Sequence, residues 1–320
     1  MTSRRFIAAF AAASLLLAAA PARGQKSVYL KRLSLPVTGD DIAYGHCVTA
    51  DPHTGEVFVC DPRTNRILIF DRSGNFDFQI VGGLEVAAPQ DLAVDPDGLL
   101  VVLATVGDRR QVVELDFDGR FRREVPLAGL PPDAKAPSLT SVALAPKGDR
   151  LYAADLANAM LWIADRDGLV LKGILLADEL TEAEQRDFVI GHVDAYGDRV
   201  VVAMPSFGQI LVFSLDGEPA GSVGVLGSAG CQLGRPTAAA VDRDGDLLVL
   251  DSQRMIVARW RIAGNRCLSE HIGLGDQPGF LFFPYDLSLD PEGRFYVAQS
   301  ADGRVQVFEG LGAAPPAPPR

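Results

Sequence analysis

The sequence predicts an all-β fold, a six-bladed β-propeller with four-stranded antiparallel blades, and three observations lead to it. A glycine-centred turn recurs along the chain, a second turn recurs in phase with it, and the last of six units is one strand short. A period in the forties with four short strands per unit is typical of a propeller blade. A strand-like run near the start of the chain is available to complete the last unit.

The glycine turn first occurs in DRSGNF, at residues 71–76, and returns as DFDGRF, DRDGLV, SLDGEP and RIAGNR. Glycine suits this place because a tight hairpin often needs a positive φ. Successive copies are 45 to 49 residues apart. The aligned glycines are Gly74, Gly119, Gly168, Gly217 and Gly264.

A second turn, of Asp-Pro type, separates two short apolar strands in each unit. It occurs at residues 51–52, 95–96, 145–146, 242–243 and 290–291, and as a shorter Gly-Asp turn at 197–198. Each unit is therefore strand A, Asp-Pro-type turn, strand B, polar loop, strand C, glycine turn and strand D. A β-sandwich is the alternative, but two turn series that keep phase over six units disfavour it.

The ends of the repeat predict how the ring closes. The sixth unit has strands at 286–290, 295–298 and 304–308, and then the chain becomes rich in proline and alanine. The unassigned run at 28–37 is expected to pair with 305–308 as the fourth strand of this unit. Closure of this kind removes exposed sheet edges and links both ends of the domain.

Several of these units resemble NHL repeats. The resemblance is carried by CDPRTNRILIFDRSGNF at 60–76, PQDLAVDPDG at 89–98 and FPYDLSLDPEGRFYVA at 283–298, and it extends over about residues 28–310. It implies a six-bladed propeller. It implies little about function, because this fold hosts binding modules, lactonases and lyases.

The two ends of the chain differ in composition from the repeats. Arg4 and Arg5 precede an apolar run at 6–20 and small residues that suit cleavage, so residues 1–24 are expected to be a removable signal peptide. The Sec and twin-arginine routes both remain open. The domain is expected over 25–311, with a disordered Pro/Ala-rich tail at 312–320. This predicts an exported protein, periplasmic or extracellular.

The charge of the chain limits its partners. The formal net charge is −11, and loss of three arginines with the signal peptide makes it more negative. Nucleic acids and anionic membranes bind clustered Lys and Arg, so both are disfavoured. No other stretch is long and apolar enough to span a bilayer. A protein or a small-molecule ligand is the expected partner.

Four cysteines in an exported chain favour two disulfides. If Ala50 faces Val57 across the first Asp-Pro turn, then Cys47 faces Cys60, within disulfide range. Cys231 and Cys267 remain by elimination. Because the first of these lies in a blade connection and the second follows a glycine turn on the opposite face, free thiols stay an alternative for this pair.

One face of the propeller is expected to carry the functional site. We call it the loop face; it holds the B–C loops and the long, irregular blade connections, whereas the opposite turn face holds the short uniform turns. Long loops on a rigid scaffold are common places for binding sites. The connection at 177–188 contains Thr181 and Glu184 in capping-box spacing, which predicts a short helix that acts as a lid or simply covers the channel.

Polar residues begin several strands A, where the chain comes nearest the central channel. Histidine with carboxylates is a plausible ligand set for a divalent metal, calcium or zinc, and histidine also performs acid–base catalysis. The alternative is a hydrogen-bonded polar lining of a watery channel. The candidate metal ligands are His46, Asp91, His192 and Asp286, and the candidate catalytic residues are His46 and His192.

The loops that follow strands B supply candidates for ligand binding. An aspartate ends strand B in three units, and arginines follow it in two of these loops. As an alternative, aspartate here bonds nearby backbone N–H groups and organises the loop, and exposed arginine is simply solvated. The candidates are Asp61, Arg63, Asp155, Asp251 and Arg254.

These patterns favour an exported binding or scaffolding module that engages a partner through the loop face. The alternative is a metal-dependent hydrolase or lyase. Among the catalytic families of this fold, gluconolactonase-like lactonases use a first-strand glutamate that is absent here, and Thr140 and Ser141 stand where their asparagine is expected. Amidating lyases need three channel histidines, of which His46 and His192 are the ones well placed here.

Overall fold

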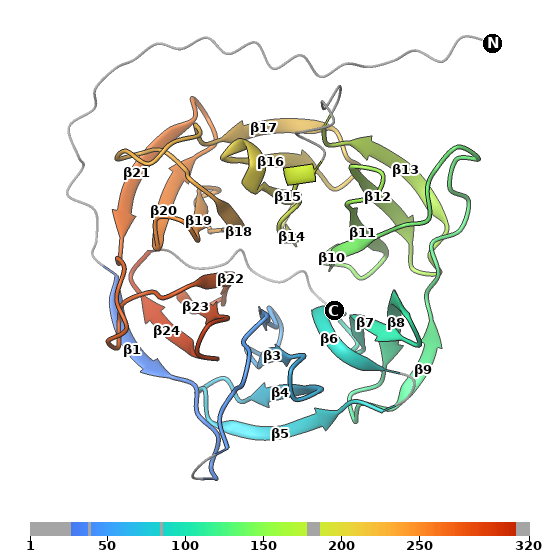
Figure 1. Cartoon of the computed structure of the whole chain (residues 1–320), viewed down its shortest axis with the longest axis horizontal. Coiled ribbons are helices and arrows are strands. Elements are labelled where there is room, and N and C mark those ends of the chain that lie inside the picture. The colour runs from blue at the N-terminus through green and yellow to red at the C-terminus, as the bar shows by residue number, and fades with distance from the viewer. Residues whose placement is uncertain (1–26, 38–39, 84–85, 178–185, 312–320) are drawn as a thin grey trace.

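The computed structural model describes residues 27–37, 40–83, 86–177 and 186–311. The predicted signal peptide, the tail and the capping box at 181–184 lie outside the described residues. Six four-stranded antiparallel sheets stand around a central axis (Figure 1). The described residues include no helix long and apolar enough to cross a membrane.

Blades 1 to 3 each follow the chain from the inner strand A to the outer strand D. Blade 1 comprises β2 (Cys47–Ala50), β3 (Val57–Asp61), β4 (Arg66–Phe70) and β5 (Phe76–Val81). Blade 2 comprises β6 (Ala87–Val94), β7 (Leu100–Val106), β8 (Arg109–Leu115) and β9 (Phe121–Glu124). Blade 3 comprises β10 (Leu139–Leu144), β11 (Arg150–Asp155), β12 (Met160–Asp165) and β13 (Val170–Leu175).

Blades 4 and 5 repeat this order, whereas blade 6 takes its outer strand from the start of the chain. A short 3-10 helix, η1 (Pro205–Phe207), lies in the B–C loop of blade 4. Blade 4 comprises β14 (Val193–Tyr196), β15 (Arg199–Met204), β16 (Gln209–Ser214) and β17 (Pro219–Val223). Blade 5 comprises β18 (Pro236–Val241), β19 (Leu247–Asp251), β20 (Ile256–Arg261) and β21 (Arg266–His271). Blade 6 comprises β22 (Pro284–Leu289), β23 (Arg294–Gln299), β24 (Val305–Glu309) and β1 (Val28–Arg32).

The N-terminal strand closes the ring, as predicted. In Figure 1 the blue β1 lies beside the red β24, and the two pair antiparallel from Val28 opposite Glu309 to Arg32 opposite Gln306. One residue beyond the strand, the Leu33 backbone N–H donates to the Val305 carbonyl at 2.9 Å. The first and last strands of the domain are therefore joined in one sheet.

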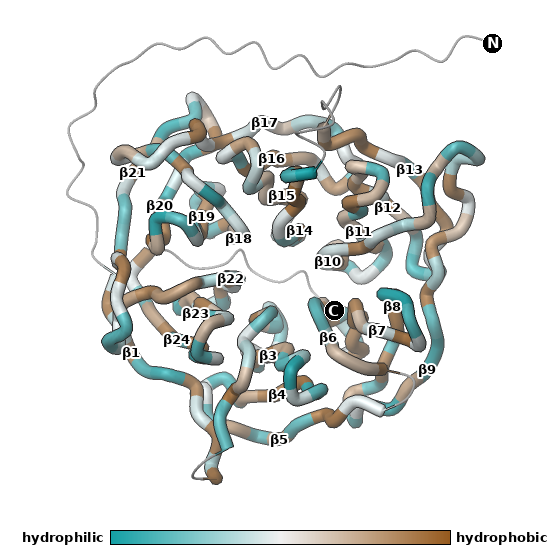
Figure 2. Tube along the Cα trace, in the orientation of Figure 1, coloured by the Kyte–Doolittle hydropathy of each residue, from teal (hydrophilic) through white to brown (hydrophobic). Residues whose placement is uncertain are grey.

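The apolar core lies in the seams between blades. The described residues form six buried clusters, one in each seam, and each draws side chains from two neighbouring blades. Figure 2 accordingly shows hydrophobic residues spread through all six blades. The middle strands pack on both faces, so β3 and β4 are buried throughout, whereas the outer strand β13 alternates between half-buried and exposed residues.

The recurring glycines have the backbone conformation that their place in the repeat predicted. All five have a positive φ, between 72° and 88°. In the first copy the Gly74 N–H donates to the Asp71 carbonyl at 2.7 Å, and the Asp71 side chain accepts the Asn75 N–H at 2.9 Å. An aspartate and a left-handed glycine together define this turn in blades 1 to 3, whereas Ser214 takes the place of the aspartate in blade 4.

Two disulfides are present. Cys47 faces Cys60 in the β2–β3 ladder and is bonded to it, with a Cα–Cα distance of 4.9 Å. Cys231 is bonded to Cys267 with a Cα–Cα distance of 5.6 Å, so the argument from opposite faces was wrong for this pair. The connection before blade 5 reaches the outer strand β21, where the Cys231 N–H donates to the Glu270 carboxylate at 2.8 Å.

Candidate functional site at the channel mouth

Equivalent residues of the six inner strands form two layers across the channel at the loop face. Their equivalence follows from the strand A–B pairing, in which Cys47, Asp91, Ser141, Ala238 and Asp286 hold the same place. The Gly191 N–H bonds to Ala203 as the His46 N–H bonds to Cys60, which places blade 4 in the same register. The upper layer is His46, Gln90, Thr140, Gly191, Thr237 and Tyr285. The lower layer is Cys47, Asp91, Ser141, His192, Ala238 and Asp286.

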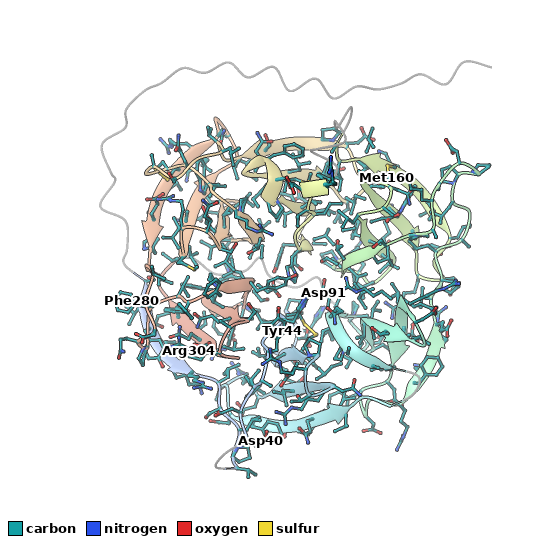
Figure 3. The ribbon with its side chains drawn as sticks, in the orientation of Figure 1. Asp40, Tyr44, Asp91, Met160, Phe280 and Arg304 are labelled. Carbon is teal, nitrogen blue, oxygen red and sulfur yellow. A yellow bond between two sulfur atoms is a disulfide. The ribbon has the colours of Figure 1, made fainter. Side chains whose placement is uncertain are left out.

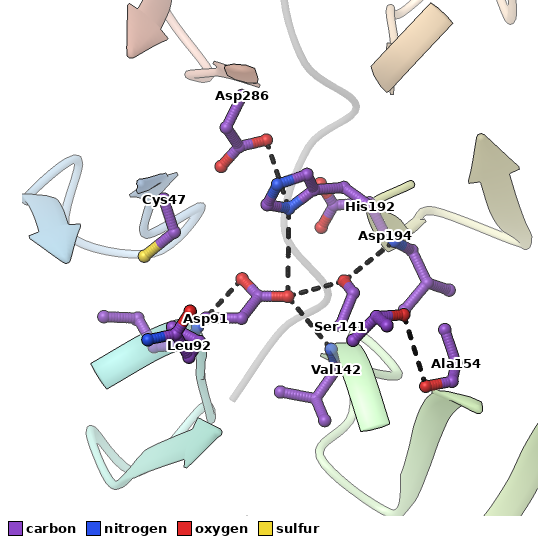
Figure 4. Close-up of polar contacts among 12 residues, drawn as sticks. Cys47, Asp91, Leu92, Ser141, Val142, Ala154, His192, Asp194 and Asp286 are labelled. Carbon is purple, nitrogen blue, oxygen red and sulfur yellow. Dashed lines mark hydrogen bonds and ion pairs between the residues drawn. The ribbon is translucent and has the colours of Figure 1, made fainter. Parts of the chain in front are cut away.

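The two carboxylates of the lower layer each bind the next blade. Asp286 accepts the Val48 N–H of blade 1 at 2.8 Å. Asp91 accepts the Val142 N–H of blade 3 at 3.0 Å and the Ser141 hydroxyl at 2.5 Å, as Figure 4 shows. Both side chains are almost fully buried. These candidate ligands therefore also hold neighbouring blades together.

His192 lies between these two acids. Its Nδ1 is 3.4 Å from an Asp286 carboxylate oxygen and 3.8 Å from one of Asp91 (Figure 4). The His192 backbone N–H donates to the Thr237 carbonyl at 2.8 Å, an approach of blades 4 and 5 that depends on Gly191. A Cβ at that glycine would come within 2.6 Å of the same carbonyl oxygen. The structure thus brings three of the four predicted metal candidates into one buried cluster.

Burial changes the protonation of the acids in this cluster. It raises the pKa of Asp286 to about 6; the charge of His192 opposes this rise and that of Asp91 adds to it. Burial also raises the pKa of Asp91. Further along the channel, burial and the charges of Asp286 and Asp91 raise the pKa of Asp194, which accepts the Tyr196 hydroxyl at 3.2 Å. The channel therefore contains three acids that hold protons more tightly than ordinary carboxylates.

His46 occupies the upper layer because it precedes the position of the acids by one residue. Its Nδ1 is 2.7 Å from the Gln90 carbonyl oxygen, which can only accept, so Nδ1 carries the proton. Nε2 then has a lone pair, with no hydrogen-bond partner among the described residues. Burial, with the charge of His192 as second cause, lowers the pKa of His46 to about 4, so the ring is neutral at pH 7.

Aromatic rings surround His46 at the mouth. The Tyr285 ring centroid is 4.4 Å from that of His46 and 5.3 Å from that of His192. Tyr44 is 5.6 Å from His46, and the Arg63 guanidinium carbon lies 5.6 Å from the Tyr44 centroid. Figure 3 shows Tyr44 and Asp91 near the middle of the ring. Burial raises the pKa of Tyr285 to about 12, so its hydroxyl stays protonated.

The aspartates that end strands B organise loops. Asp61 accepts the Ala43 and Tyr44 N–H groups at 2.9 and 3.1 Å, and thereby positions one ring of the mouth. Asp155 and Asp251 likewise accept backbone N–H groups of the preceding connections, and all three are fully buried. In blade 6 the Gln299 amide oxygen accepts the Phe282 N–H at 2.5 Å.

The two arginine candidates have different surroundings. Arg63 is exposed above Tyr44 at the mouth. Arg254 instead pairs with Glu270 at 2.5 Å and donates to the Gln232 carbonyl at 2.6 Å. Arg254 therefore supports the connection that bears Cys231, away from the two channel layers.

Sequence reasoning missed Tyr44, Ser141, Asp194 and Tyr285. Tyr285 immediately precedes Asp286, as His46 precedes Cys47, so an alignment of inner strands would have placed both rings in one layer. Ser141 occupies the place of Asp91 in the next blade. Its hydroxyl accepts the Val193 N–H at 2.9 Å and extends the same chain of contacts into blade 4.

Among the described residues, two groups have three potential metal ligands whose donor atoms all lie within 4.8 Å of one another, and neither is in the channel. One is Cys231, Cys267 and Glu270, where the sulfurs form a disulfide. The other is Asp242, Asp244 and Asp246 in the A–B turn of blade 5. Arg259 lies 2.6 Å from Asp242 and 2.7 Å from Asp244, and so neutralises much of that cluster.

The fold and this mouth define the class as a six-bladed all-β propeller with a polar channel. No protein-family model matches the chain. It is 30% identical over 105 residues to NHL-repeat-containing protein 4 from Homo sapiens, which is 33% of this chain and 78% of the relative. The chain belongs to the NHL-repeat proteins, as its repeats indicated.

Solved structures share the fold at low identity. A protein of unknown function from Bacteroides thetaiotaomicron has a TM-score of 0.63 and 15% identity, over 89% of this chain and 76% of that one. A catalytically inactive virginiamycin B lyase from Staphylococcus aureus, with quinupristin, has a TM-score of 0.58, 16% identity and coverages of 86% and 82%. The Cps50 (Swd1) propeller domain from Myceliophteria thermophila has a TM-score of 0.57, 13% identity and coverages of 83% and 97%.

Proposed function

We propose that this chain is an exported binding or scaffolding propeller whose ligand or protein partner docks at the channel mouth on the loop face. One observation carries the proposal: half-buried His46, Tyr44 and Tyr285 are packed ring to ring, and His46 keeps an unpaired Nε2. Apolar rings with a few convergent polar groups are what small-molecule and side-chain pockets usually present.

The surroundings of His46 support a preformed site. The next residue, Cys47, is bonded to Cys60, and Asp61 holds the backbone at Tyr44. Because these contacts fix the rings before a partner arrives, little ordering is needed on binding. Two disulfides and the predicted signal peptide at 1–24 both support export to an oxidising compartment.

A metal-dependent hydrolase or lyase is the second candidate. It is favoured by the unpaired Nε2 of His46 beside His192, whose Nδ1 approaches two carboxylates. A neutral imidazole is a suitable zinc ligand, whereas calcium prefers oxygen donors such as Asp91 and Asp286. One solved structure with this fold is a lyase, so the fold is compatible with such chemistry.

Matched surface variants test the docking site. The wild-type protein, the mouth variants Tyr44→Ala and Tyr285→Ala, and the turn-face control His53→Ala would each be immobilised. A periplasmic or extracellular extract of the source cells would then be passed over each of them. We expect the two mouth variants to lose the retained molecule and the control to keep it. Retention that is lost only with the turn-face variant would refute docking at the mouth.

Metal content separates the two candidates. Protein purified without added metal would be analysed for bound ions and then titrated calorimetrically with zinc and with calcium. A stoichiometric ion that is lost in His46→Ala and kept in His53→Ala favours the enzyme. Absence of a tightly held ion, with a retained partner, favours the binding module.

A further inference from the structure

Resting on the proposed function, we infer that the channel mouth binds a planar ligand that carries a single carboxylate. The planar group packs against the rings of Tyr285 and His46, and the carboxylate lies between Arg63 and Arg110. The inference assigns a ligand class to the mouth and a role to Arg110, which sequence reasoning did not select.

The first observation is that these two arginines lack acidic partners in an acidic protein. Most arginines of the described part of the chain lie within 4.0 Å of a carboxylate, for example Arg66, which pairs with Asp40 at 3.0 Å. Arg63 and Arg110 are exposed and form no such pair with any described residue. Two guanidinium groups without acidic partners at one place, in a chain with 41 acidic residues against 30 basic ones, can bind an anion there.

The second observation is that both arginines belong to the mouth. Arg63 lies over the Tyr44 ring, and Arg110 is the second residue of β8, where the B–C loop of blade 2 ends. The side chain of Arg110 makes a long contact of 3.5 Å with the Leu139 carbonyl of blade 3. Burial is the main cause of the low pKa of His46, and the charge of Arg110 lowers it further, as expected for a nearby cation.

The third observation is a buried hydroxyl without a partner in the same layer. Thr237 is 7% exposed, and its Oγ1 has no hydrogen-bond partner among the described residues. Thr237 holds the upper-layer place next to Tyr285, and its carbonyl accepts the His192 N–H. Buried polar atoms are nearly always satisfied, so this hydroxyl is available to bond a ligand oxygen at the mouth.

The charges beneath the mouth favour one negative charge on the ligand. Asp286, directly after Tyr285, has a pKa of about 6, so it is mostly ionised at pH 7 and repels anions. A phosphate with two charges is repelled more strongly than a carboxylate, and a planar carboxylate matches the fork of a guanidinium. A flat apolar group beside the carboxylate then covers the exposed parts of the Tyr285 and His46 rings.

Three probes of similar size test this class: benzoate, neutral benzamide and doubly charged phenyl phosphate. Each would be titrated into the full-length protein while NMR follows the His46 ring and the backbone. We expect benzoate to bind with a dissociation constant of about 1 mM, and benzamide about tenfold more weakly. Arg63→Gln and Arg110→Gln should each weaken benzoate about tenfold and leave benzamide unchanged.

The control is Arg266→Gln, which removes an exposed arginine at the turn-face end of β21. It should leave benzoate affinity unchanged. Equal affinity for benzoate and benzamide, tighter phenyl phosphate, or no effect of either mouth arginine would refute the carboxylate inference but keep the docking site. If no probe binds, the inference fails and the partner-retention experiment alone judges the docking site. If Tyr285→Ala leaves benzoate binding intact, neither the docking site nor the carboxylate site is at the channel mouth.

Discussion

Asp286 in blade 6 accepts a hydrogen bond from the Val48 backbone N–H in blade 1 at 2.8 Å, and so joins the last and first blades beside the channel. Asp91 does the same between blades 2 and 3 through Val142. Each acid thus has a structural role, and each also approaches His192. An alanine at either place would remove both the hydrogen bond to the next blade and the contact with His192. Conservative substitutions are therefore needed to separate the two roles.

Asp286→Asn should change how stability depends on pH. Burial raises the pKa of the folded-state carboxyl to about 6 from 3.8, so the folded protein binds the extra proton and wild type loses stability as pH rises from 4 to 6. The neutral amide has no such loss. Relative to wild type, the variant should gain about 3 kcal/mol between pH 4 and pH 7 in urea unfolding. If the difference in unfolding free energy between variant and wild type does not change with pH, burial does not raise the pKa of Asp286.

His46→Gln should give the opposite pH dependence. The pKa of His46 is lowered to about 4 from 6.5, so the unfolded chain takes up the proton first and wild type loses stability as pH falls through this range. Glutamine keeps an N–H donor and cannot charge. Its stability relative to wild type should rise by about 3 kcal/mol from pH 7 to pH 4. His53→Gln on the turn face is the control, and an equal rise there would contradict the assignment to the mouth.

The fold was predictable because its determinants are local and repeated. Asp-Pro-type turns and glycine turns mark the blades in the sequence. Blade 6 lacks a fourth strand at the end of the repeat, and the run near the start of the chain supplies it as β1. The pairing of Cys47 with Cys60 also followed from one turn, since the β2–β3 ladder has no irregularity.

The site was less predictable because it depends on irregular register. The strand A–B ladders of blades 2, 3, 5 and 6 each have a register shift near their loop-face end, and blade 1 has none. Residue counting correctly puts His46 level with Gln90, but it does not reveal the contact between His192 and the two acids. The side-chain contacts of Tyr285 and Ser141 arise between blades far apart in sequence, so a local pattern does not report them.

The Cys47–Cys60 disulfide should contribute measurably to stability. Both residues are fully buried, and the bond closes a loop with a sequence separation of 13 residues. The double variant Cys47→Ala/Cys60→Ala should lose about 3 kcal/mol in the free energy of unfolding. Peptide mapping without reduction should recover Cys47 linked to Cys60. Linkage of Cys47 to Cys231 or Cys267 would contradict the β2–β3 register.

Closure by β1 should stabilise the whole ring. Leu33, directly after this strand, is fully buried in the seam between blades 6 and 1. Leu33→Ala should cost about 2–5 kcal/mol, and deletion of 25–37 should cost more because blade 6 loses its outer strand. Val37, 63% exposed, provides the control, since Val37→Ala should change stability by less than about 0.5 kcal/mol. Unchanged cooperative melting of the deletion variant would contradict closure.

Asp155 distinguishes a loop-organising aspartate from a ligand-binding one. Its fully buried carboxylate accepts the Ser138 N–H at 2.8 Å, the Trp162 Nε1–H at 2.9 Å and the Asn158 amide at 2.6 Å. Of these three hydrogen bonds, the one from Trp162 is buried and the other two are half-buried. Asp155→Ala leaves the buried Trp162 N–H unsatisfied, whereas the two half-buried donors can reach water, so we expect a loss of about 1–3 kcal/mol.

Urea unfolding of Asp155→Ala beside the exposed control Asp149→Ala would measure this loss, and the control should change little. Benzoate affinity, measured at a temperature where the variant remains folded, should be unaffected because the Asp155 side chain contacts neither the rings nor the arginines of the mouth. Intact stability with lost binding would instead make Asp155 a ligand residue, and would move the site outward from the channel to the B–C loop of blade 3.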